Sequence, residues 1–85
     1  AFLRTYDRAL NLLAARARSS TELRRKLVEK GEPAALADQA IARLTELGLL
    51  NDEDYARQVA RGRLLGGASK GRVQQELWRR GVSRD

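Results

Sequence analysis

Two stretches decide the fold of this chain: Leu23-Arg24-Arg25-Lys26-Leu27-Val28-Glu29-Lys30-Gly31 and, fifty residues later, Val73-Gln74-Gln75-Glu76-Leu77-Trp78-Arg79-Arg80-Gly81. The apolar positions and the glycine are in register between them. A period of this length, combined with helical apolar spacing, is typical of proteins built from repeated helical modules that bury their apolar faces against one another. The second copy stops at Asp85, where the first is only beginning its last helix. We therefore expect a fragment of a longer protein, holding less than two modules.

The apolar residues recur with the period of a helix throughout the chain, and no segment alternates as a strand does. The sequence thus predicts an all-α fold of tandem three-helix repeats, with a first module over residues 1–48 and a truncated second module over residues 49–85. Five helices are predicted, at about Tyr6–Ala17, Ser20–Lys30, Pro33–Leu47, Asp52–Leu65 and Lys70–Arg80. In the first of these, the predicted inward stripe is Tyr6, Leu10, Leu13, Ala14 and Ala17.

Several residues are typical helix starts and stops. Ser19 and Glu22 have the spacing of a capping box, in which the hydroxyl accepts an N–H and the carboxylate reaches back. Ser69 is placed to cap the last helix, and Gly31 and Gly81 to stop the two matching helices. The acidic residues 52–54 lie in a predicted first turn, where the helix dipole favours negative charge, so capping is a better explanation for them than metal binding.

The composition excludes several classes of function. There is no cysteine and no histidine, which removes disulfides, thiolate metal sites and the commonest general base. We expect no catalytic residue, no metal site and no cofactor. The longest apolar runs are far shorter than a membrane span, and none has the form of a signal peptide. The sequence thus predicts a non-enzymatic protein that does not enter a membrane.

Positive charge is concentrated in the second half of the chain. Seventeen Lys and Arg against eleven Asp and Glu give a net charge of +6. Between Tyr55 and Arg84 there are eight basic residues and a single acidic one, Glu76, so that window carries a net charge of +7. A surface of one sign favours an anionic partner, with nucleic acid first, a membrane surface second and an acidic protein third. The alternative is a solvated basic face that only keeps the protein soluble.

The chain resembles the RecX family of bacterial recombination regulators. The resemblance rests on Tyr6-Asp7-Arg8-Ala9-Leu10, on Ser19 to Leu27, on Leu44 to Ala56, on Arg61-Gly62-Arg63 and on Gly71 to Gly81. It implies an elongated, curved array of three-helix repeats in the bacterial cytoplasm. It also implies that the protein binds the RecA recombinase filament on single-stranded DNA, and restrains its ATP hydrolysis and strand exchange.

Such a role needs cations that contact phosphate or acidic protein along a filament groove. The candidate residues for contact with the filament, and with single- or double-stranded DNA, are Arg57, Arg61, Arg63, Lys70, Arg72, Arg79 and Arg80 in the second module and Arg24, Arg25 and Lys26 in the first. Helical spacing places Arg63 near an apolar stripe, so we expect it to snorkel or to meet a partner.

Two other classes of function stay open at this stage. A helix-turn-helix module would place a basic helix in the major groove, and residues 70–80 carry Gln74 and Gln75 as such helices do. A helical repeat that binds only protein would use its charge for solubility.

Trp78 either packs in a core or interface, which we favour, or stacks on a base. Without a third helix in the second module, we expect Leu77 and Trp78 to be poorly covered, which would allow self-association.

Overall fold

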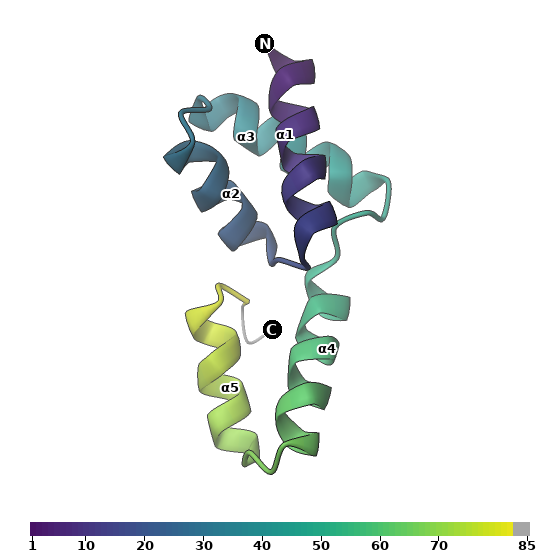
Figure 1. Cartoon of the computed structure of the whole chain (residues 1–85), viewed down its shortest axis with the longest axis vertical. Helices are drawn as coiled ribbons and strands as arrows, with labels where there is room; N and C mark the ends of the chain where they lie inside the picture. Colours follow the sequence, from purple (N-terminus) through teal and green to yellow (C-terminus); the bar gives the residue numbers. More distant parts are fainter. Residues whose placement is uncertain (83–85) are drawn as a thin grey trace.

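The computed structural model describes residues 1–82, which form five helices and no strand (Figure 1). Arg84, the last residue of the basic window, lies outside the described residues. The molecule is elongated, with extents of 44 × 23 × 21 Å. The helices are α1 (Phe2–Ala15), α2 (Ser20–Glu29), α3 (Ala34–Glu46), α4 (Asp52–Leu65) and α5 (Lys70–Arg79). The all-α prediction is confirmed.

Helices α1, α2 and α3 enclose the main apolar core. Its members come from all three helices and from the loop after α3: Ala9, Leu23, Leu27, Ala37, Ala40, Leu44 and Leu50. Four of these seven are leucines and three are alanines, so the helices approach closely around short side chains and interlock through long ones. These three helices form a packed unit.

Helices α4 and α5 form an antiparallel hairpin at the other end of the molecule (Figure 1). Its buried apolar side chains, among the residues described, are only Tyr55, Val73 and Val82. Apolar burial is the main force that stabilises a small unit, and three side chains supply little of it. The hairpin must therefore gain much of its stability from contact with the first three helices.

The repeat is preserved in backbone geometry. The bounds of α4 and α5 are those of α1 and α2 shifted by fifty residues. Both α2 and α5 end in the same arrangement: the amide of Glu32 donates to the Leu27 carbonyl, and the amide of Val82 to the Leu77 carbonyl. In each, the intervening glycine has a positive φ, of 96° at Gly31 and 85° at Gly81, as this helix stop requires.

The predicted bounds of the first helix were wrong. It begins four residues earlier than Tyr6 and ends at Ala15. The Arg18 guanidinium donates a hydrogen bond to the Leu12 carbonyl in its last turn. The fully buried positions are Thr5 and Ala9. Of the predicted stripe, Tyr6, Leu10 and Leu13 do pack, half-buried, against the core, whereas Ala14 and Ala17 are exposed. The apolar stripe was placed too near the C-terminal end because the short side chains that face the core are not the most hydrophobic ones.

Three smaller predictions also differ from the structure. Pro33 precedes the third helix as its cap instead of being its first residue. The apolar pattern also predicts Leu47, Leu49 and Leu50 to face inward, but Leu47 and Leu49 are about half exposed and only Leu50 of the three is buried beneath the bundle. Ser19 does accept the Glu22 amide at 3.2 Å. The Glu22 carboxylate, however, faces Tyr55 and Arg16, so only half of the predicted capping box forms.

A buried carboxylate fixes the end of α2 against α1. Thr5 Oγ1 donates to Glu32 Oε1 at 2.5 Å, and the Arg8 guanidinium lies 3.2 Å from the other oxygen. The Thr5 hydrogen bond lowers the pKa of Glu32 below its ordinary value; burial opposes this, and the charges of Arg8 and Arg4 add to it. The ionised form is therefore the one that the fold stabilises.

The two equivalent glycines give a matched test of the junction between the modules. A Cβ at Gly81 would lie 2.5 Å from the Thr21 Cβ, whereas one at Gly31 would meet nothing within 4 Å. Both substitutions incur the cost of a positive φ, on the order of 1 kcal/mol. We expect Gly81→Ala to lower the urea midpoint clearly more than Gly31→Ala does. Equal shifts would contradict the close approach of α5 to α2.

The Glu32 carboxylate predicts an acid-dependent loss of stability. The unfolded chain takes up this proton near pH 4.5, and the folded chain does so only at lower pH. The unfolded state thus binds more protons there, and the free energy of unfolding falls as pH drops below about 4.5. Urea unfolding at several pH values should show a shallower fall in Glu32→Gln. An identical slope in both proteins would contradict this role.

Candidate nucleic-acid interface

The two modules meet where α2 begins and α5 ends. Ser19 Oγ donates to the Arg80 carbonyl, and Thr21 Oγ1 to the Gly81 carbonyl at 3.1 Å. These carbonyls have no partner within their own helix, and the positive end of the α2 dipole faces the negative end of α5. Polar side chains of one module thus cap a helix of the other.

Helix α4 is attached at the same place. The Ser20 amide and hydroxyl donate to the two oxygens of Asp52, at 2.8 and 2.6 Å. The Tyr55 hydroxyl donates to Glu22 Oε1 at 2.9 Å and accepts from Arg80 Nη1 at 2.9 Å. Because Tyr55 is 5% exposed, this phenol bridges the modules in a place largely shielded from water.

Glu76 gathers arginines on the hairpin. Its two oxygens accept from Arg63, Arg79 and Arg80 at 2.9, 2.5 and 3.0 Å. The hydrogen bonds from Arg80 and Arg63 lower the pKa of Glu76, against the effect of burial. The hydrogen bonds that Arg80 donates, first to Tyr55 and then to Glu76, raise the pKa of Arg80. Glu76 and Arg80 are therefore both ionised at neutral pH. Of the two outcomes expected for Arg63, snorkelling or contact with a partner, the structure shows contact with a partner, the Glu76 carboxylate.

Two open hollows adjoin this cluster. One lies along α5 and is lined by Arg63, Ala68, Arg72, Val73, Gln75, Glu76, Trp78 and Arg79. The other crosses the junction between the modules and is lined by Arg16, Glu22, Arg25, Glu76, Arg79 and Arg80. Arg79 and Glu76 line both, so the hollows adjoin. We call the six arginines that line them the arginine face: Arg16, Arg25, Arg63, Arg72, Arg79 and Arg80.

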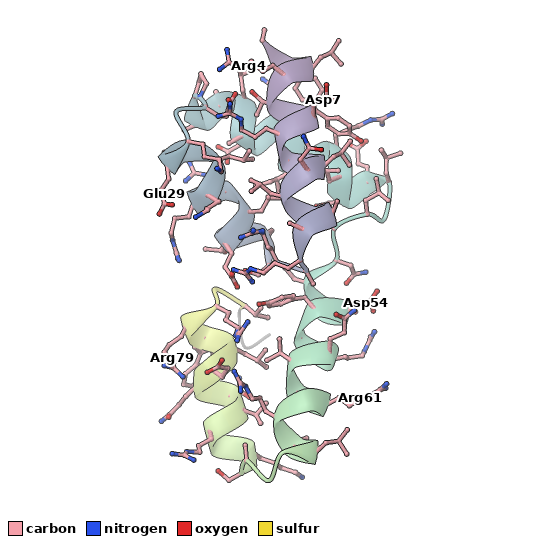
Figure 2. All side chains as sticks on the ribbon, viewed as in Figure 1. Arg4, Asp7, Glu29, Asp54, Arg61 and Arg79 are labelled. Carbon is pink, nitrogen blue, oxygen red and sulfur yellow. The ribbon has the colours of Figure 1, made fainter. Side chains whose placement is uncertain are left out.

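The predicted site residues do not all lie together. Figure 2 shows Arg61 and Arg79 projecting from opposite edges of the hairpin, one from α4 and the other from α5. Arg57 and Arg61 line a separate depression on α4, and Arg57 is paired with Asp54 at 2.6 Å and with Glu53. The single surface expected from the charge window is therefore divided between two edges.

In the first module, the structure separates the predicted Arg24-Arg25-Lys26 cluster. Arg24 is paired with Asp38 at 2.6 Å, which raises the Arg24 pKa through that hydrogen bond, and Lys26 lies 3.8 Å from Glu29. Arg25 belongs to the arginine face. Lys70 is exposed and lines neither hollow. Within residues 1–82, Arg25, Arg61, Lys70 and Arg72 form no ion pair.

Arg16 was missed by the sequence analysis. It follows α1, far from the basic window, and reaches the face because α1 ends beside α2, where its guanidinium lies 3.5 Å from Glu22. Trp78 was favoured as a core or interface residue, and core placement is wrong, because 47% of it is exposed. The expected poor covering is confirmed for Trp78. Leu77 is half-buried, so it is better covered than expected.

Across residues 1–82, no group of acidic side chains has the arrangement of a metal site. No helix in the same range is long and apolar enough to cross a membrane.

The fold and its surface define a class: tandem three-helix modules, joined through polar side chains, that present a row of arginines across their junction. Two family models match the chain: RecX, first three-helix domain, over residues 6–44, and RecX, second three-helix domain, over residues 51–85. The chain belongs to the RecX family.

Individual relatives agree. The chain is 42% identical over 77 residues to Regulatory protein RecX of Mycolicibacterium vanbaalenii, covering 89% of this chain and 42% of that protein. It is 40% identical over 76 residues to Regulatory protein RecX of Pseudomonas entomophila, covering 89% of this chain and 49% of that protein. The chain thus spans about half the length of these relatives, or less. No solved structure matches it significantly.

Removal of one hydroxyl tests the bridge between the modules. Tyr55→Phe leaves the partly buried Glu22 and Arg80 without a shared partner, so we expect a loss of about 1–3 kcal/mol in the free energy of unfolding. Tyr6→Phe is the matched control, because among residues 1–82 the Tyr6 hydroxyl makes no hydrogen bond. Urea unfolding followed by circular dichroism measures both. Equal effects would show that the bridge contributes nothing.

Proposed function

We propose that this chain takes part in regulating homologous recombination by binding the RecA filament on single-stranded DNA through its arginine face, and that it inhibits ATP hydrolysis and strand exchange there. The observation that carries the proposal is the arginine face itself, which crosses both modules. The names of the relatives, each a regulatory protein of the RecX type, support the regulatory role.

The charge of this surface suits a polyanion. Six arginines and the two carboxylates of Glu22 and Glu76 line the hollows, for a local charge of 6 − 2 = +4. Phosphate contacts are additive, independent of base sequence, and strengthened by release of counterions. Arginine also presents a planar fork of donors that matches phosphate geometry. A surface of this kind can therefore follow a nucleoprotein filament without reading its sequence.

The junction supports this role by fixing the modules relative to each other. Arg16 and Arg25 belong to one module and Arg72 and Arg79 to the other, so their spacing depends on the Ser19, Thr21 and Tyr55 hydrogen bonds. Cations already held in place lose less conformational entropy on binding than mobile ones. The proposal requires binding and positioning, and no catalytic residue.

A helix-turn-helix role for α5 is the competing proposal. Its exposed side carries Arg72, Gln75 and Arg79, which suit a major groove. Competition between specific and random duplexes separates the two proposals, because sequence-specific modules prefer their sites by about a thousandfold or more. Equal competition by random duplexes would favour the filament proposal.

The main test uses the single-stranded DNA-dependent ATPase activity of RecA. We expect the chain to lower it, and we expect the triple variant Arg25→Gln/Arg72→Gln/Arg79→Gln to need at least about tenfold more protein for the same effect. In binding to labelled single-stranded DNA, loss of three cations should reduce the salt slope by about 2, at about 0.7 for each phosphate contact.

The matched control is Arg24→Gln/Arg43→Gln/Arg57→Gln, which removes the same charge from residues outside both hollows. These three form exposed surface ion pairs that contribute little to stability. If both triple variants lose activity equally, net charge acts and the arginine face does not. If the unmodified chain changes neither ATPase activity nor DNA binding, the proposed function is wrong.

A further inference from the structure

The exposed indole of Trp78 lies within the hollow along α5, beside cations that the proposed function uses for phosphate. Helical spacing places Arg72, Gln75 and Arg79 along one line of the helix, and Trp78 one turn beyond Gln75 on the adjoining line. The side chain of Arg79 is 77% exposed and that of Arg63 is 53% exposed. An aromatic ring, an amide and several guanidiniums therefore share one open surface.

The repeat shows that the position of Trp78 faces outward in both modules. The equivalent residue in the first module is Val28, which is 42% exposed where Trp78 is 47% exposed. The position thus faces outward in both modules, and the fold is satisfied there by a small side chain. The indole occurs only in the second module, where the hollow is lined by arginines. The exposed part of the indole presents a flat aromatic surface that is well suited to contact a flat ligand.

We infer that this hollow binds an unpaired nucleobase, which stacks on Trp78 while Arg72 and Arg79 hold the adjoining phosphates. The inference rests on the proposed function and adds to it a preference for single strands. Bases within a duplex are already stacked on one another and cannot present a face to the indole, whereas single strands can. Gln75 lies between the ring and the arginines, within reach of a base edge.

The sole tryptophan of the chain makes the test direct. Its fluorescence reports on Trp78 alone and is titrated with oligothymidylate, with an abasic tetrahydrofuran oligomer of the same length, with a blunt duplex and with polyglutamate. We expect oligothymidylate to quench the emission and to bind about 5- to 150-fold more tightly than the abasic oligomer, the range that stacking of one base supplies.

The matched variant is Trp78→Val, which installs the residue that the first module carries. Measured by anisotropy of labelled oligomers, it should bind oligothymidylate only as tightly as the abasic oligomer, with an unchanged salt slope. Circular dichroism checks that it is folded. Trp78→Phe keeps an aromatic face and should recover part of the lost affinity.

The outcomes separate this inference from the proposed function. Equal affinity for oligothymidylate and the abasic oligomer, or for single strand and duplex, would overturn base stacking and leave phosphate binding intact. Quenching by polyglutamate but by no oligonucleotide would overturn it in favour of an acidic protein ligand. Binding to none of these probes would overturn the proposed function itself, and base stacking with it.

Discussion

The first turn of α2 holds the last carbonyls of α5, and the remainder of the molecule depends on this contact. The hairpin of α4 and α5 buries few apolar side chains of its own within the residues described. Three contacts position it. Hydroxyls of Ser19 and Thr21 donate to carbonyls at the end of α5, and Asp52 of α4 accepts from the first turn of α2. The Tyr55 phenol lies between the Glu22 carboxylate and the Arg80 guanidinium. Such contacts are directional, so they fix an orientation that apolar packing alone would leave adjustable. The arginine face spans both modules only because this orientation is fixed.

Glu76 has two opposing effects on that face. Its negative charge reduces the potential that an anionic ligand meets, which by itself would weaken binding. Without it, however, Arg63, Arg79 and Arg80 would repel one another, and their long side chains would be free to move. The carboxylate holds all three from one point. Glu76 thus lowers the net positive charge of the hairpin but orders its arginine donors. Arg72 has no such ion pair within residues 1–82, so its charge is not reduced by a neighbouring carboxylate.

The fifty-residue repeat predicted the fold class from sequence, and it contained more than was taken from it. The fourth helix was predicted as Asp52–Leu65, as observed. Shifted back by fifty residues, it gives Phe2–Ala15, which is the observed first helix, and the buried Tyr55 gives Thr5, which is buried as well. The apolar stripe alone misplaced that helix because threonine and alanine are weak hydrophobic signals. The charge count found the basic half of the chain but could not divide its cations between the two edges of the hairpin. Nor could it bring Arg16 to the face, because that placement depends on tertiary contacts.

The two modules show how one scaffold acquires different surfaces. Thr5 and Tyr55 occupy the same place in the repeat, and both are buried. The short threonine hydroxyl reaches Glu32 within its own module, whereas the longer phenol reaches across the junction to Glu22. Lys26 and Glu76 are likewise equivalent: the first pairs locally with Glu29, and the second gathers three arginines. The helix bounds are shared, and α2 and α5 also share a serine cap and a glycine stop, so the differences at these positions lie in the side chains. A repeat that keeps its core can therefore join its neighbour at one position and gather arginines at another without altering the fold.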